Sequence, residues 1–157
     1  MRRSLLTSVI VAFGLFALLT TAKSIHAQDD PQPSRDPNVF KAQLQEFILI
    51  TKKNLRDIQA LPVDDSIPVD PQVRGNAHRA YKLIRAAQWG MGLAIERQPY
   101  QDPILGLAQK RVTTAWHLAR FPVDNTNLSS RSEYINTSVQ NLSSSLKLVQ
   151  QALVMIP

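Results

Sequence analysis

Three Asp-Pro pairs beyond residue 35 divide that part of the chain and restrict its fold more than any other feature of the sequence. They occur at Asp36-Pro37, Asp70-Pro71 and Asp102-Pro103. An Asp that precedes a helix accepts hydrogen bonds from the free N–H groups of the first turn and complements the positive end of the helix dipole. Proline suits the first helical position because it lacks the N–H that would find no partner there. Each pair therefore predicts the start of a helix.

Apolar residues follow each pair at spacings of three and four, which is typical of one face of a helix. The first helix is expected to end near Ala60, ahead of Pro62. The second is expected to end before Pro99 and the third at Pro122. The three apolar faces are Phe40, Leu44, Phe47, Thr51, Leu55 and Ile58; Val73, Ala77, Ala80, Ile84, Ala87, Met91 and Ile95; and Leu105, Ala108, Val112, Ala115, Trp116 and Ala119.

A fourth helix is predicted without an Asp-Pro pair. Ser130, followed three residues later by Glu133, has the pattern of a capping box. The apolar residues beyond it alternate at spacings of four and three, as in the seam of a helical bundle. They are Ile135, Val139, Leu142, Leu146, Val149, Leu153 and Ile156.

No segment alternates apolar and polar residues beside hairpin signals, so strands are not predicted. Short connectors favour antiparallel packing of helices that follow one another in the chain. Residues 36–157 are therefore expected to form an all-α, up-down-up-down four-helix bundle domain.

The first 27 residues have the pattern of a cleaved secretory signal peptide. Arg2 and Arg3 precede the apolar run Leu5–Leu19, and Ala27 suits the last position before the cut, with Ala22 as the alternative. Residues 28–35 are polar and contain two prolines, which favours a short disordered leader. The protein is expected to be exported.

The cysteine count and the net charge narrow the compartment and the kind of partner that the protein can have. The chain has no Cys. An exported domain without disulfides suits a thylakoid lumen or a bacterial periplasm better than a small extracellular module. Arg2, Arg3 and Lys23 leave with the signal, which reduces the net charge from +6 to +3. That excess is too mild to indicate nucleic acid as a partner.

No catalytic set is found, so the chain is not expected to be an enzyme. There is no phosphate loop, nucleophile elbow or zinc-protease motif. The two histidines beyond the signal, His78 and His117, lack a carboxylate or second His at helical spacing. A haem would need a pair such as His117 with Met91, but His117 falls off the apolar face of its helix. No cofactor or metal is therefore expected.

One polar face is a candidate docking surface. Five residues of the second helix fall in line, and no acidic residue lies between Asp70 and Glu96. Arg85 and Trp89 are one turn apart, so the guanidinium could stack on the indole. The face is either a solvated surface or a docking stripe for an acidic partner or an anionic lipid surface. Its residues are Arg74, His78, Lys82, Arg85 and Trp89.

The last two predicted helices resemble the closing helix pair of the PsbQ-type extrinsic subunits of photosystem II. The similarity rests on VTTAWHLAR (residues 112–120) and, after a polar loop, SEYINTSVQNLSSSLKLV (residues 132–149). The family also has a Tyr early in the last helix, here Tyr134, and a run rich in Ser, Asn and Leu after it. Cyanobacterial members are commonly lipoproteins, whereas this chain has no Cys to carry a lipid.

The resemblance implies a non-catalytic extrinsic subunit that binds and stabilises a photosynthetic complex at its lumenal face. The expected function is therefore docking on the lumenal or periplasmic face of a membrane protein complex, such as photosystem II. The alternative is a periplasmic helical bundle that binds a metal, haem or small ligand.

Overall fold

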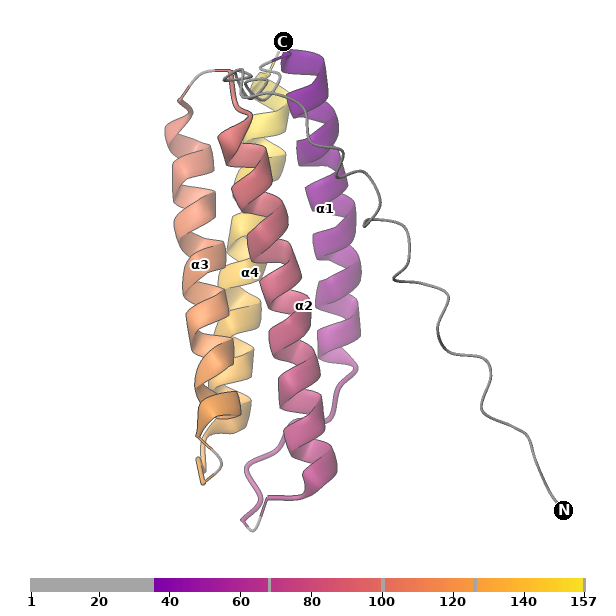
Figure 1. The fold of residues 1–157 in the computed structure, drawn as a ribbon, viewed down its shortest axis with the longest axis vertical. Helices are drawn as coiled ribbons and strands as arrows, with labels where there is room; N and C mark the ends of the chain where they lie inside the picture. The colour runs from indigo at the N-terminus through magenta and orange to yellow at the C-terminus, as the bar shows by residue number, and fades with distance from the viewer. Residues whose placement is uncertain (1–35, 68, 100, 126, 157) are drawn as a thin grey trace, which may run out of the picture. The chain divides into compact units, whose positions relative to one another are not determined.

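The chain forms the predicted four-helix bundle, and each helix runs antiparallel to the next, as the computed structural model shows (Figure 1). The helices are α1 (Pro37–Gln59), α2 (Pro71–Glu96), α3 (Pro103–Asp124) and α4 (Arg131–Met155). The structure describes residues 36–67, 69–99, 101–125 and 127–156, which contain no strand. The predicted signal peptide and leader lie outside these residues.

The Asp-Pro pairs begin three of the helices in the expected way. The carboxylate of Asp36 accepts a hydrogen bond from the backbone N–H of Asn38 at 2.8 Å. Asp70 accepts one from Gln72 at 2.6 Å, and Asp102 accepts one from Ile104 at 2.8 Å. Proline occupies the first turn of all three helices.

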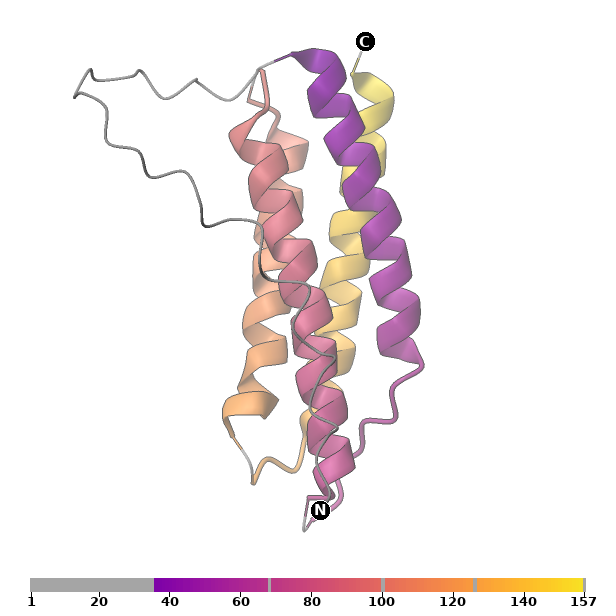
Figure 2. The same ribbon diagram turned by 45° about the vertical axis from the view of Figure 1, so that its right-hand side comes forward.

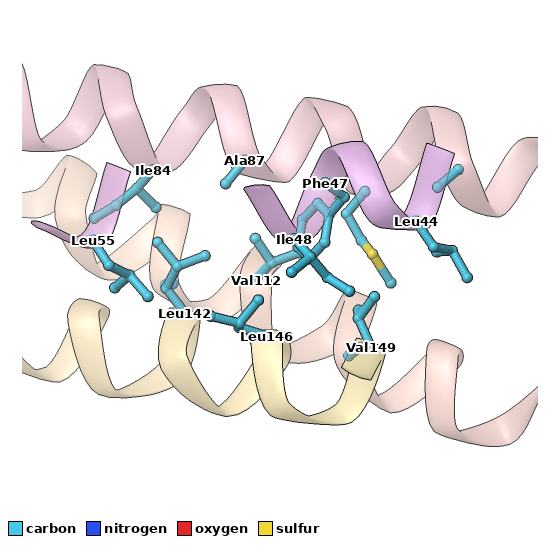
Figure 3. Close-up of a cluster of buried hydrophobic side chains, with 14 of the residues drawn as sticks. Leu44, Phe47, Ile48, Leu55, Ile84, Ala87, Val112, Leu142, Leu146 and Val149 are labelled. Atoms are coloured by element: carbon cyan, nitrogen blue, oxygen red, sulfur yellow. The ribbon is translucent and has the colours of Figure 1, made fainter. Parts of the chain in front are cut away.

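The predicted apolar faces meet in one core (Figure 3). Leu44 of α1, Ile84 of α2, Val112 of α3 and Leu142 of α4 all belong to this core between the helices. All four of these residues are completely buried. The exceptions to the prediction are Ile95, Trp116, Val139 and Leu153, which are only partly buried at the edge of the core.

The helices differ in how closely they approach one another. α2 lies between α1 and α3, and α4 packs against both α1 and α3 (Figure 2). α3 and α4 are in close contact, because the hydroxyl of Ser145 on α4 donates a hydrogen bond of 2.8 Å to the backbone carbonyl of Ala108 on α3. Such a bond requires small residues at the contact, and Ala108 and Ser145 are both fully buried.

Pro122 does not end the third helix, so that prediction was wrong. α3 continues to Asp124, with Pro122 buried inside its last turn. Proline removes one backbone donor, but near the end of a helix the loss is limited to a single bond. The N–H of Asn125 still reaches the carbonyl of Phe121 at 3.1 Å, which closes the helix after the proline.

The capping box of the fourth helix is also absent, although the helix begins where predicted. Ser130 is the residue before the first turn, but its side chain makes no capping hydrogen bond. Asp65, from the connector between α1 and α2, caps the helix instead. Its carboxylate accepts bonds from the N–H of Ser132 at 2.9 Å and from the Ser132 hydroxyl at 2.6 Å.

Arg131 fastens the same connector to α4. Its side chain is 1% exposed and donates to the carbonyl of Ser66 at 2.7 Å and to that of Leu128. The hydroxyl of Ser132 beside it lowers the pKa of Asp65, with the backbone N–H of Ser132 and the positive charge of Arg131 acting in the same direction. The α1–α2 connector is therefore part of the packed structure.

None of the helices α1 to α4 is both long and apolar enough to cross a bilayer.

Candidate docking surface

All five residues of the predicted stripe lie on the outer face of α2. Arg74, His78, Lys82 and Arg85 are exposed, and Trp89 continues their line with 65% of its surface exposed. The structure therefore brings together on one surface every residue that the spacing selected. It also places Trp89 outside the core.

The stripe faces solvent because the opposite side of α2 is built for burial. Ala77, Ala80, Ala87 and Ala94 on that side are at most 1% exposed. A helix with one apolar stripe turns its polar face outward. The long basic side chains are therefore left on the outside.

Among the described residues, no ion pair neutralises the positive charge of this face. The ion pairs among the described residues are Lys53–Asp57 and Arg120–Asp124, and neither involves α2. Arg79, which the prediction omitted, is also exposed on α2 and adds a further charge beside Lys82. An uncompensated basic face attracts and orients negatively charged partners.

The predicted stacking of Arg85 on Trp89 is not found. The ring contacts of the described residues involve His78 with Tyr81, Trp116 with His117, and Phe121 with Tyr134. Trp89 instead lines a groove that opens between α1 and α2. The indole of Trp89 therefore forms part of the groove lining and is not stacked on the guanidinium of Arg85.

The groove is the feature that sequence reasoning missed. Its volume is about 340 Å³, and most of its lining is apolar. Phe47 and Ile50 contribute from α1, and Trp89, Gly90 and Leu93 contribute from α2. Gln43 and Glu46 are the polar residues that line it.

Two signals in the sequence could have revealed the groove. Gly90 interrupts the apolar pattern of α2. Trp89 and Leu93 are one turn apart on the outer side of α2, where large apolar side chains do not contribute to the core of the bundle. Large apolar residues that are exposed side by side are typical of a surface that binds another group.

The structure places both histidines beyond the signal on the surface of the bundle. His78 and His117 are both exposed, whereas Met91 is completely buried in the core. The structure therefore does not bring His117 together with Met91. In the described part of the chain, no three His, Cys, Asp or Glu residues lie close enough to hold a metal ion.

Comparisons with known proteins do not add an assignment. No protein-family model, curated protein or solved structure matches this chain.

Proposed function

We propose that this protein is a non-catalytic interaction subunit that docks through the outer face of α2 on a membrane protein complex. The complex lies on the lumenal or periplasmic side of its membrane, and the resemblance of α3 and α4 to PsbQ-type subunits points to photosystem II. The observation that carries the proposal is the exposed, acid-free basic face of α2, which ends at Trp89.

The two parts of this face support docking in different ways. The charges of Arg74, Lys82 and Arg85 speed and orient the encounter with an acidic surface, and salt screens their effect. Trp89 contributes more to the bound state, because burying a large aromatic side chain removes much apolar surface from water. Trp and Arg are among the residue types most enriched at binding hot spots.

Rebinding to membranes tests the proposal. Membranes from the source organism are washed with salt, and the purified protein is added back at increasing ionic strength. We expect Trp89→Ala to weaken binding by about 2 kcal/mol or more, which is the hot-spot threshold. The double variant Arg74→Glu with Lys82→Glu should associate more slowly and show a flatter salt dependence.

A charge-matched control comes from the other side of the bundle. Lys110 on α3 and Lys147 on α4 are exposed basic residues outside the proposed surface. The double variant Lys110→Glu with Lys147→Glu changes the net charge by the same amount as the α2 variant. Equal loss of binding in the two double variants would reduce the α2 face to a solvated helix surface.

A second candidate function is a periplasmic bundle that binds a small apolar ligand. The groove favours it, since pockets for small molecules start near its volume of about 340 Å³. Native mass spectrometry of protein purified from the source would detect such a ligand as added mass. A ligand lost in Leu93→Ala and retained in the Lys110→Glu, Lys147→Glu variant would favour this function over docking.

A further inference from the structure

The groove between α1 and α2 is an open apolar site on an otherwise packed bundle. Ile50, Trp89 and Leu93 border it and are 43%, 65% and 44% exposed. Three large apolar side chains around one depression leave a contiguous apolar surface in contact with water. Patches of this kind are typical of binding sites in soluble proteins.

A missing side chain creates the depression. Gly90 lines the groove together with Trp89 and Leu93. A methyl group at Gly90 would meet only the ring of Phe47, at 3.9 Å, so the space beside the helix is empty. Phe47 is 3% exposed, whereas the rim residues stand out into solvent. The groove therefore has a preformed apolar surface that an incoming side chain can cover without rearrangement of the core.

The charges around the groove differ from one side to the other. On α2, Arg85 and Lys82 precede Trp89 by one and two turns and are exposed. On α1, Glu46 lies in the groove lining and is also exposed. A flat anionic lipid surface that covered the groove would meet Glu46 with like charge. A polypeptide can place its acidic residues toward Lys82 and Arg85 and keep them away from Glu46.

An unpaired acceptor is a further sign of a protein partner. Gln43 lines the groove from α1, and its Oε1 atom is buried without a hydrogen-bond partner. Leaving a buried acceptor unpaired is costly. A polar N–H of a bound segment would satisfy it after rotation of the side chain, which an acyl chain of a lipid could not do.

We propose that the α1–α2 groove receives the apolar side chains of an acidic amphipathic helix of the partner protein. The apolar face of that helix covers Gly90 and Phe47, and its acidic residues face Lys82 and Arg85. Seating of an amphipathic helix in an apolar groove is a common mode of peptide recognition. The inference rests on the proposed docking function and specifies the chemistry of the partner.

Two glycines provide a matched test of the groove. Gly90→Leu places a side chain in the groove, whereas Gly106→Leu adds the same side chain on α3, at a position with nothing within 4 Å of the added carbon and outside the groove lining. In the membrane rebinding assay, we expect Gly90→Leu to weaken binding by about tenfold or more. Gly106→Leu should bind within about twofold of the wild type.

A second variant covers the case in which Gly90→Leu fails to fold. Ala86 is exposed and lines the groove, so Ala86→Phe obstructs the site from a solvent-facing position. Thermal unfolding of each variant shows whether the bundle is intact. Weakened binding by folded Ala86→Phe supports the inference, and binding equal to that of the wild type overturns it.

Photo-crosslinking identifies what fills the groove. Leu93 is replaced by p-benzoylphenylalanine, the protein is rebound to the washed membranes, and the adduct is sequenced by mass spectrometry. We expect an adduct on a segment with apolar residues at helical spacing and acidic residues beside them. An adduct on lipid, on a small apolar molecule or on a basic segment overturns the inference.

The outcomes separate this inference from the proposed function. If the wild type does not rebind, or if the α2 charge variant rebinds normally, both proposals fail together. If the charge variant and Trp89→Ala lose binding while Gly90→Leu and Ala86→Phe keep it, docking stands and the groove is not its site.

Discussion

The α3–α4 interface and the α1–α2 interface both contain small residues, but the two helices approach each other more closely in the first than in the second. On the α3–α4 side, a serine hydroxyl reaches the backbone of the facing helix at 2.8 Å. On the α1–α2 side, the helices leave a groove of about 340 Å³ bordered by exposed apolar residues. Small residues occur in both, as Ala108 in the first and Gly90 in the second.

The difference lies in what faces the small residues. A small residue lets two helices approach only if its neighbours across the interface are also small. Ser145 faces Ala108, so the α3 and α4 backbones come together. Phe47 lies beside Gly90, and its ring keeps α1 away from α2 at that level. One interface is therefore closely packed, whereas the other leaves an open groove.

The α3–α4 side and the α1–α2 side should differ most in how much stability is lost when a leucine side chain is truncated. Leu146 on α4 is 8% exposed, and Leu146→Ala should destabilise the bundle by about 2–5 kcal/mol because it leaves a cavity. Leu93→Ala, at the groove, should cost less than about 1 kcal/mol since Leu93 is 44% exposed. Chemical denaturation of both variants measures the two costs, and equal values would show that the groove side is as packed as the seam.

Insertion of a larger side chain should give the next largest contrast. Ser145 is fully buried, so Ser145→Leu forces α3 and α4 apart and should cost about 1–3 kcal/mol. Ala86→Leu, on the exposed groove side, should change the free energy of unfolding by less than about 0.5 kcal/mol. A shift of the denaturation midpoint in Ala86→Leu as large as that in Ser145→Leu would contradict the comparison.

Replacement of glycines in α2 tests the same comparison through an expected gain in stability instead of a loss. Gly90→Ala should stabilise the bundle by about 1 kcal/mol, because alanine favours a helix interior and the added methyl group has room beside Phe47. Gly92→Ala should stabilise it by a similar amount, since nothing lies within 4 Å of the added carbon. Thermal unfolding of the two variants tests this, and destabilisation confined to Gly90→Ala would mean that the groove is closed in solution.

The smallest expected effect on stability concerns Asp65, whose hydrogen bonds to Ser132 join the α1–α2 connector to the start of α4. Asp65 caps α4 from the α1–α2 connector, and Asp65→Ala should cost about 0.5–1 kcal/mol at neutral pH. Asp64→Ala is the control, because the hydrogen bonds of Asp64 to Ser66 stay inside the connector. Denaturation at neutral pH compares the two variants, and equal costs would mean that the cap on α4 adds no stability of its own.

The Asp65 contribution should also depend on pH. The hydrogen bond from Ser132 lowers the pKa of Asp65 in the folded state below its ordinary value of 3.8. The folded state therefore favours the carboxylate, and this stabilisation is complete above the ordinary pKa and lost as the pH falls through the lowered one. The difference between wild type and Asp65→Ala should shrink below pH 3.8, and a difference that grew in acid would contradict the assigned cause.

The sequence by itself determined the helices and their order. Asp36, Asp70 and Asp102 begin helices through contacts within two residues of themselves, and such local contacts are the same in any fold. The spacing of Leu142, Leu146 and Val149 likewise predicts a buried face whatever packs on it. The outward position of the Arg74 to Trp89 stripe follows from the same periodicity, because the opposite face of α2 is apolar.

Only the tertiary structure decided the features that join residues far apart in the chain. Asp65 caps α4 from 67 positions away, so the local signal at Ser130 and Glu133 predicted the right start and the wrong cap. Arg131 is buried because the carbonyl of Ser66 lies beside it, which its own neighbours in sequence do not indicate. The groove exists because Phe47 of α1 meets Gly90 of α2, and helical periodicity predicts which face of each helix is buried but not which side chains meet across it.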